Sequence, residues 1–115
     1  MISSISSSLS AIKSYGQKMD VTANNVANAN SDEFKKSAAY LKEGYNGGVE
    51  VDIKKIESKG PLYSEANSMK LKEGSNVDLA EEIPQMMVSQ RGYEANLKTL
   101  KTQDEMVGTV LNIVT

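Results

Sequence analysis

The sequence predicts a mainly α-helical protein in which two long terminal helices form an antiparallel helical hairpin, or coiled coil, around a small β-structured insert. Apolar residues recur at alternating steps of three and four at both ends of the 115-residue chain, as they do in coiled-coil helices. The middle alternates apolar with charged residues between glycine-containing turns, which is typical of short strands. We therefore expect a single domain over residues 1–115, divided into 1–30, 31–75 and 76–115.

The first repeat lies in residues 1–30. Its members are Ile2, Ile5, Leu9, Ile12, Gly16, Met19, Ala23, Val26 and Asn30. Seven serines precede Tyr15, and serine is a mediocre helix former because its hydroxyl competes for backbone hydrogen bonds. We expect this helix to form only when it packs along its seam. The run from Asn24 to Asn30 should end it, since asparagine suits helix ends and turns.

The insert predicts a small hairpin or a three-stranded meander. Residues 44–48 form a glycine-rich turn, and Val49, Val51 and Ile53 alternate with charged residues as in a half-buried strand. A second turn at Gly60 precedes two further short alternating pieces. Such an insert is too small to be stable alone, so it should lean on the helices.

The second repeat occupies residues 76–115. Its seam is Leu79, Ile83, Met86, Gln90, Tyr93, Leu97, Leu100, Asp104, Val107, Leu111 and Val114. This helix would span roughly 50 Å at 1.5 Å per residue, so it needs a partner along its length. Asp78 is the best N-cap candidate, with Glu81 placed to complete a capping box. Pro84 should bend the helix near its start, the interpretation we favour, or mark where regular helix begins.

Little catalytic chemistry is available to this chain. It has no cysteine and no histidine, which removes thiol nucleophiles, imidazole bases and the usual zinc ligands. Glu50 and Asp52 could pair as glycosidase carboxylates do, but the solvent face of a hairpin explains them better. Asp104 in the seam fits a register-setting polar residue better than a catalytic one. No phosphate loop or metal-ligand spacing occurs, so we expect no enzyme, no catalytic residue, no metal and no cofactor.

Composition also narrows the partners. The net charge is −2 and Arg91 is the single arginine, which argues against nucleic-acid binding. No stretch reaches the ~20 apolar residues of a membrane span, so direct membrane insertion is not expected. Residues 1–30 have only two lysines on a serine-rich polar face, which disfavours a membrane-surface helix. The first residues also lack the basic region of a secretory signal peptide.

Two segments carry a resemblance. Residues 25–35 read NVANANSDEFK, whereas residues 75–79 read SNVDL and residues 90–96 read QRGYEAN. In this order, and beside the two heptad helices, they resemble the bacterial flagellar rod and hook family of axial proteins. The chain departs from the family pattern at Glu33, where a glycine is usual, and at Gly92, where an alanine is common. Pro84 is also unusual.

The resemblance implies a structural subunit that the flagellar type III export apparatus carries out of the cytoplasm without a cleaved signal. Such subunits stack helically, with copies of themselves or with other rod and hook proteins, through their terminal helices. The short insert is more like that of a proximal-rod protein of the basal body, in the periplasm-spanning rod, than that of a hook protein. The expected assembly interface is Ile5, Leu9, Ile12, Met19, Asn25, Val26, Asn28, Asn30, Met86, Gln90, Arg91, Tyr93, Asn96, Leu97, Leu100, Val107 and Leu111.

The alternative is a cytoplasmic coiled-coil adaptor or chaperone-like binding module of the flagellar system. It would share the heptads, but it has no need for the asparagine run or for the segment at residues 90–96.

Overall fold

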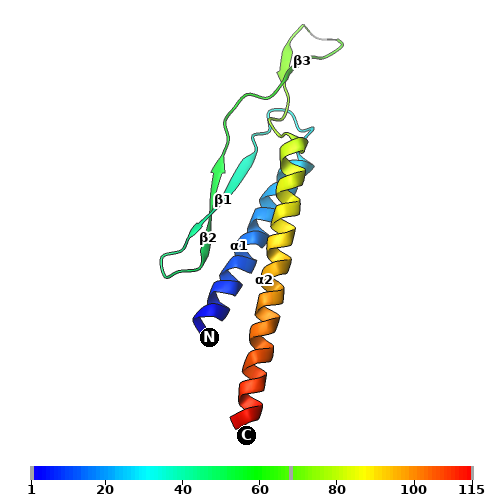
Figure 1. Ribbon diagram of the computed structural model, residues 1–115. Coiled ribbons are helices and arrows are strands. Elements are labelled where there is room, and N and C mark those ends of the chain that lie inside the picture. Colours follow the sequence, from blue (N-terminus) through cyan, green and yellow to red (C-terminus); the bar gives the residue numbers. More distant parts are fainter. Residues whose placement is uncertain (1, 68, 115) are drawn as a thin grey trace.

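Two long antiparallel helices, with two small β-hairpins between them in the chain, make up the protein (Figure 1). This computed structural model describes residues 2–67 and 69–114. Its elements are α1 (Ile2–Ala27), β1 (Ser37–Glu43), β2 (Val49–Lys55), β3 (Leu62–Ser64), β4 (Leu71–Glu73) and α2 (Leu79–Val114). The molecule is a rod of 78 × 24 × 15 Å with both termini toward one end. The predicted fold class is confirmed.

The helix ends follow from local sequence. α1 ends at Ala27, inside the asparagine run that was predicted to end it. The Oδ1 of Asp78 accepts a hydrogen bond from the Ala80 N–H at 3.0 Å, which confirms the predicted N-cap. The Glu81 carboxylate accepts a hydrogen bond from Lys36 Nζ at 3.0 Å, which connects the start of α2 to the insert. α2 continues through Pro84, and the alternative start at that proline is wrong.

The insert forms two separate antiparallel hairpins and not a three-stranded meander. β1 pairs with β2 from Ser37↔Lys55 to Glu43↔Val49, and β3 pairs with β4 over three residues. The turn at residues 44–48 and the strand after it are confirmed. Between the hairpins the chain passes close to Gly74, and a Cβ on Gly60 would lie 2.1 Å from the Gly74 carbonyl oxygen.

The fully buried side chains of α1 and α2 are small or polar. Among the described residues, Ala11 is the one apolar side chain that is buried, together with Ser8, Thr22 and Asn25 of α1 and Glu82 and Ser89 of α2. The Ser8 hydroxyl donates a hydrogen bond to Gln103 Oε1 at 3.4 Å. Small side chains let the two helix backbones approach closely, but they bury little apolar surface. The intramolecular seam is therefore thin.

The predicted seam of α2 is split by this arrangement. One column of the repeat is half-buried: Met86, Tyr93, Leu100 and Val107. The other column is exposed: Ile83, Gln90, Leu97, Asp104 and Leu111. The side of α2 that faces α1 combines the half-buried column with a polar column: Glu82, Ser89, Asn96 and Gln103. The contact surface with α1 therefore replaces one column of the predicted apolar seam by this polar column. Asp104, a polar member of the predicted seam, lies at the surface.

Tyrosine and glycine interlock at the middle of the hairpin. A Cβ on Gly92 would lie 2.5 Å from a ring carbon of Tyr15, and a Cβ on Gly16 would lie 3.8 Å from the ring of Tyr93. Each aromatic ring thus covers a glycine on the opposite helix. The Tyr15 ring fills the space that an alanine side chain at position 92 would need, which accounts for the glycine in this chain.

The interlock predicts opposite effects for two glycines of the same helix. Gly92→Ala should lower the free energy of unfolding by about 1 kcal/mol, because overpacking outweighs the gain in helix propensity. Gly108→Ala, where nothing lies within 4 Å of an added Cβ, should raise it by about 1 kcal/mol. Urea unfolding followed by circular dichroism measures both. Equal effects of the two substitutions would contradict the interlock.

Candidate assembly interface

Large apolar side chains recur along the exposed column of α2, which also contains Gln90 and Asp104. Ile83 is 51% exposed, Leu97 is 42% exposed and Leu111 is 59% exposed. On α1, Leu9 is 51% exposed, although α1 packs against α2 along the hairpin. These positions belong to the repeats that the sequence predicts as seams. In a single chain both repeats thus keep exposed apolar members.

The outward column widens into a groove toward the open end of the hairpin. The groove has a volume of about 540 Å³ and is lined by Ile5, Leu9, Leu97, Leu100, Lys101, Asp104 and Val107. Its floor is aliphatic, and a lysine and an aspartate stand at its edge. A side chain or a helix from another molecule could enter it without displacing any residue of this chain.

Within residues 2–67 and 69–114, no helix lies beside the last turns of α2. α2 extends past the first turn of α1 (Figure 1). Exposed apolar side chains surround this end: Met106, Val110, Leu111, Ile113 and Val114. A helix that is apolar on all sides is stable when it is enclosed by several neighbours. This end therefore favours an environment of more than one other helix.

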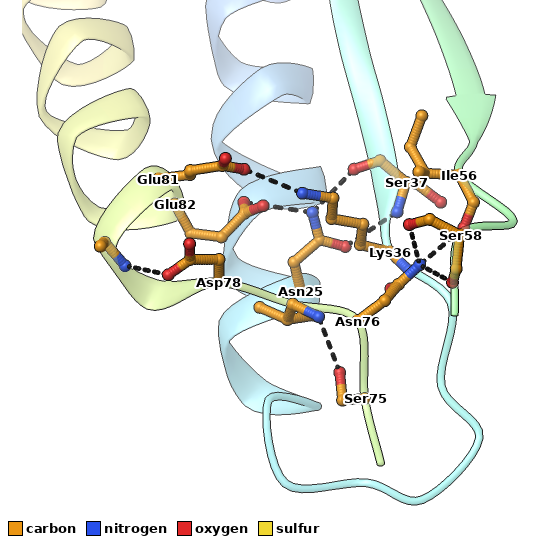
Figure 2. Close-up of polar contacts among 12 residues, drawn as sticks. Asn25, Lys36, Ser37, Ile56, Ser58, Ser75, Asn76, Asp78, Glu81 and Glu82 are labelled. Carbon is orange, nitrogen blue, oxygen red and sulfur yellow. Dashed lines mark hydrogen bonds and ion pairs between the residues drawn. The ribbon is translucent and has the colours of Figure 1, made fainter. Parts of the chain in front are cut away.

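Asn25 joins the two helices to the insert. It is 1% exposed, and its Nδ2 donates to the Ser37 carbonyl at 2.7 Å while the Ser37 N–H donates to its Oδ1 at 3.0 Å. The side-chain amide thus pairs with the end of β1 as a neighbouring strand would. The same Nδ2 lies 3.2 Å from Glu82 Oε2 of α2 (Figure 2). One residue therefore positions three elements.

Asn76 makes a second junction beside the first (Figure 2). Its Oδ1 accepts from the Lys36 N–H at 2.6 Å, and its Nδ2 donates to the carbonyls of Ile56 and Ser58 at 2.8 and 3.0 Å. Asn76 is not among the predicted interface residues. It lies in the SNVDL segment, and the resemblance of that segment to the flagellar rod and hook family could have identified it.

Two serines of α1 hold the other end of the first hairpin. The Val49 N–H donates to Ser10 Oγ at 3.0 Å, and the Ser14 hydroxyl donates to the Val49 carbonyl at 3.0 Å. The pair satisfies both backbone groups of Val49, as Asn25 does for Ser37. Two of the many serines of α1 thus have a specific role, which is to bind the start of β2. The amino-acid composition alone did not identify this role.

Glu33 lies in the loop between α1 and β1, and it is one of the three positions where the sequence departs from the pattern of the family it resembles. Glu33 has a φ of 60°, in the left-handed region that favours glycine. The glycine usual at this position in the family would adopt it without strain. Nearby, the Lys35 ammonium and the Gly60 N–H hold the pKa of the Glu73 carboxyl below its ordinary value. These bonds tie the loop to β4.

The remaining predicted residues divide between the chain's own packing and its surface. Asn28 Nδ2 donates to the Asn24 carbonyl at 2.8 Å, and Asn96 Nδ2 donates to the Gly92 carbonyl at 2.7 Å. Half-buried are Ile5, Ile12, Met19, Val26, Asn28 and Asn96, whereas Asn30, Gln90 and Arg91 are exposed. The polar members thus include both internal ties and exposed groups, of which Gln90 donates a hydrogen bond to Glu94 at 3.4 Å.

Other kinds of site do not arise from this geometry. Within residues 2–67 and 69–114, no cluster of three or more acidic residues is placed to hold a metal ion. In the same residues, no helix is long and apolar enough to cross a membrane. The described surface is therefore best characterised by its exposed apolar columns.

Family models match both ends of the chain. The model described as "Flagella basal body rod protein" matches residues 5–35, and the one described as "Flagellar basal body rod FlgEFG protein C-terminal" matches residues 71–113. These segments contain most of both helices together with Asn25 and Asn76. The chain belongs to the flagellar rod and hook family. This family is one of structural proteins and not of enzymes.

Individual relatives include both rod and hook proteins. The flagellar basal-body rod protein FlgG of Bacillus subtilis is 34% identical over 89 residues, which are 76% of this chain and 33% of FlgG. The flagellar hook protein FlgE of Escherichia coli is 49% identical over 41 residues, which are 36% of this chain and 10% of FlgE. FlgE of Treponema pallidum is 31% identical over 74 residues, 15% of its length. This rod and hook family member thus spans a third or less of these relatives.

Proposed function

We propose that this chain is a structural subunit of the flagellar basal-body rod and is most like a proximal-rod protein. The observation that carries the proposal is the distribution of apolar side chains. The most buried side chains of the two helices are serine, threonine, asparagine, alanine and one glutamate, whereas many leucine, isoleucine and valine side chains are largely exposed. Burying apolar surface is the main favourable term in folding and in association. The chain is therefore completed by neighbouring helices, from copies of itself or from other rod and hook proteins.

The size of the insert favours the rod over the hook. Between the two matched segments lie residues 36–70, which contain β1, β2 and β3 of the two hairpins. Both junctions fasten this segment to the helices through Asn25 and Asn76. The insert is thus a short segment that packs beside the helices and not a separate outer domain.

Export is the other part of the proposal. We infer that the flagellar type III export apparatus carries the chain from the cytoplasm, without cleavage of a signal, to the basal body. A thin, polar intramolecular seam suits this route, because little apolar packing within the chain has to be lost when it unfolds. An adaptor that stays in the cytoplasm would not need the outward apolar column over the whole length of α2.

Deleting the gene in its own bacterium tests the proposed position. Basal bodies purified from the deletion strain should lack a complete rod and carry no hook, and the intact gene supplied in trans should restore both. A strain with a complete rod but no hook would make the chain a hook protein. Normal flagella would overturn the structural role, and the protein confined to the cytoplasm of the wild type would favour the adaptor.

A further inference from the structure

The outer edge of β2 is free along three residues. In an antiparallel pair, the backbone N–H and C=O groups of successive residues alternate in direction. Those of one residue bond to the partner strand, and those of the next point away from it, toward the outer edge. The Gly44 N–H donates to Gly48 O at 3.1 Å and the Ile56 N–H donates to Lys36 O at 2.8 Å, so even-numbered residues bond across the hairpin. The backbone N–H and C=O groups of the odd-numbered Val51, Ile53 and Lys55 therefore point away from β1. Among the described residues, none of these groups has a hydrogen-bond partner at the outer edge.

The same alternation explains the contacts with α1. Ser37 and Val49 are also odd-numbered, and their outward groups are the ones that Asn25, Ser10 and Ser14 satisfy. α1 thus covers one end of each edge and borders Val51, which lines a pocket with Lys13 and Gln17, whereas Ile53 and Lys55 are exposed. In Figure 1 the two strands cross, and β2 lies on the side away from α1 toward its end. An edge of this kind is a template for another strand.

We propose that β2 pairs with β2 of a second copy, antiparallel and centred on Ile53, to form a four-stranded sheet across a two-fold axis. Ile53 would exchange two backbone hydrogen bonds with Ile53 of the second copy, and Val51 would pair with Lys55 on each side. This contact is independent of the proposed rod function. It is closed by its symmetry, so it describes the unassembled chain.

The charges on β2 select this partner. Asp52 and Lys54 share one face of the strand, with Lys54 Nζ 3.7 Å from Asp52 Oδ2, and their side chains are 41% and 65% exposed. In the pairing centred on Ile53, Asp52 of each copy lies directly opposite Lys54 of the other. Opposite charges in directly opposed positions stabilise an antiparallel pair. The sequence of β2 is therefore complementary to itself.

Neighbouring registers place like charges together. A pairing centred on Asp52 sets that aspartate against its own copy, and one centred on Lys54 sets two lysines together. A pairing centred on Val51 sets Asp52 against Glu50 and also needs the backbone of Val49, which the two serines of α1 occupy. Like charges directly opposite each other destabilise a sheet. Only the register centred on Ile53 avoids every such pair.

Charge reversal tests the pairing on the full chain. Sedimentation velocity should show a dimer fraction that rises with concentration. Either Asp52→Lys or Lys54→Asp alone should weaken the dimer about tenfold or more, because each sets like charges opposite one another. The double change should restore wild-type association, since the strand is again complementary to itself. A chain that stays monomeric at every concentration, or a double variant as weak as either single one, would overturn the proposal.

Cross-linking locates the contact independently, and the chain has no cysteine of its own. In the proposed register the two Ile53 Cα atoms lie about 5.5 Å apart, within disulfide range. The two Lys55 residues lie four positions apart, about 13 Å along the strands. Under mild oxidation Ile53→Cys should give disulfide dimers rapidly and Lys55→Cys should not. Circular dichroism checks that both variants are folded, and equal rates for the two would contradict this register.

Discussion

Replacing Leu97 and Leu111 by alanine should abolish assembly while leaving the free chain folded. Both side chains are only partly covered in the hairpin, 42% and 59% exposed, so the double change should lower the free energy of unfolding by only about 1–2 kcal/mol. In an assembled rod the same side chains would be buried by neighbours. A leucine truncated to alanine in a packed core costs about 2–5 kcal/mol, and every subunit would repeat that cost. Motility and electron microscopy of basal bodies report the outcome.

The matched control is Lys98→Ala, also exposed on α2. It removes a long charged side chain next to Leu97 but leaves the apolar side chains of the column in place, so motility should stay close to wild type. Immunoblotting of each strain separates failed assembly from loss of protein. Normal flagella in the double leucine variant would mean that this face of α2 is not an assembly surface.

Asn25→Ala should have the largest effect on the fold itself. The change leaves the Ser37 N–H and carbonyl without their partners and removes a hydrogen bond to the buried Glu82 carboxylate. Each buried polar group left unsatisfied costs about 1–3 kcal/mol. We expect a loss of about 3 kcal/mol in the free energy of unfolding, with the first hairpin released from α1. Thermal unfolding and amide hydrogen exchange of β1 measure the two effects.

Asn30→Ala provides the comparison, because Asn30 belongs to the same run but is exposed. Its substitution should change the free energy of unfolding by no more than about 0.5 kcal/mol. If the two alanine variants were equally stable, the Asn25 junction would not hold the insert in place.

The helices and their approximate ends could be predicted because their causes are local. The repeats fix the helical period, Asp78 caps α2 and the asparagine run ends α1 at Ala27. The face that each helix turns inward could not be predicted from apolar periodicity. The intramolecular seam uses Ser89 and Glu82, which are polar, because small residues let the helices approach and Asn25 supplies a partner for the carboxylate. The apolar seam is the outward one.

The junctions escaped prediction for a related reason. Asn76, Ser10 and Ser14 act through backbone groups of residues 20 to 40 positions away. Sequence patterns show which residues are polar but not which distant backbone groups they meet. The strand Ser37–Glu43 was missed because its two alanines and its half-exposed tyrosine obscure the alternation. Asn25 was singled out through the family resemblance, and its role as a substitute strand residue emerged only from the fold.

Cysteine accessibility at Gln90 tests most directly whether neighbours complete the outward column of α2. Gln90 is exposed and lies between Ile83 and Leu97 in that column, and Gln90→Cys would be the only thiol in the chain. In the purified protein it should react with a maleimide at the rate of an exposed thiol, whereas in isolated basal bodies it should be protected. Lys59→Cys, in the exposed segment between the hairpins, should react in both states. Equal labelling at Gln90 in the free and assembled protein would contradict burial of this face by neighbouring subunits.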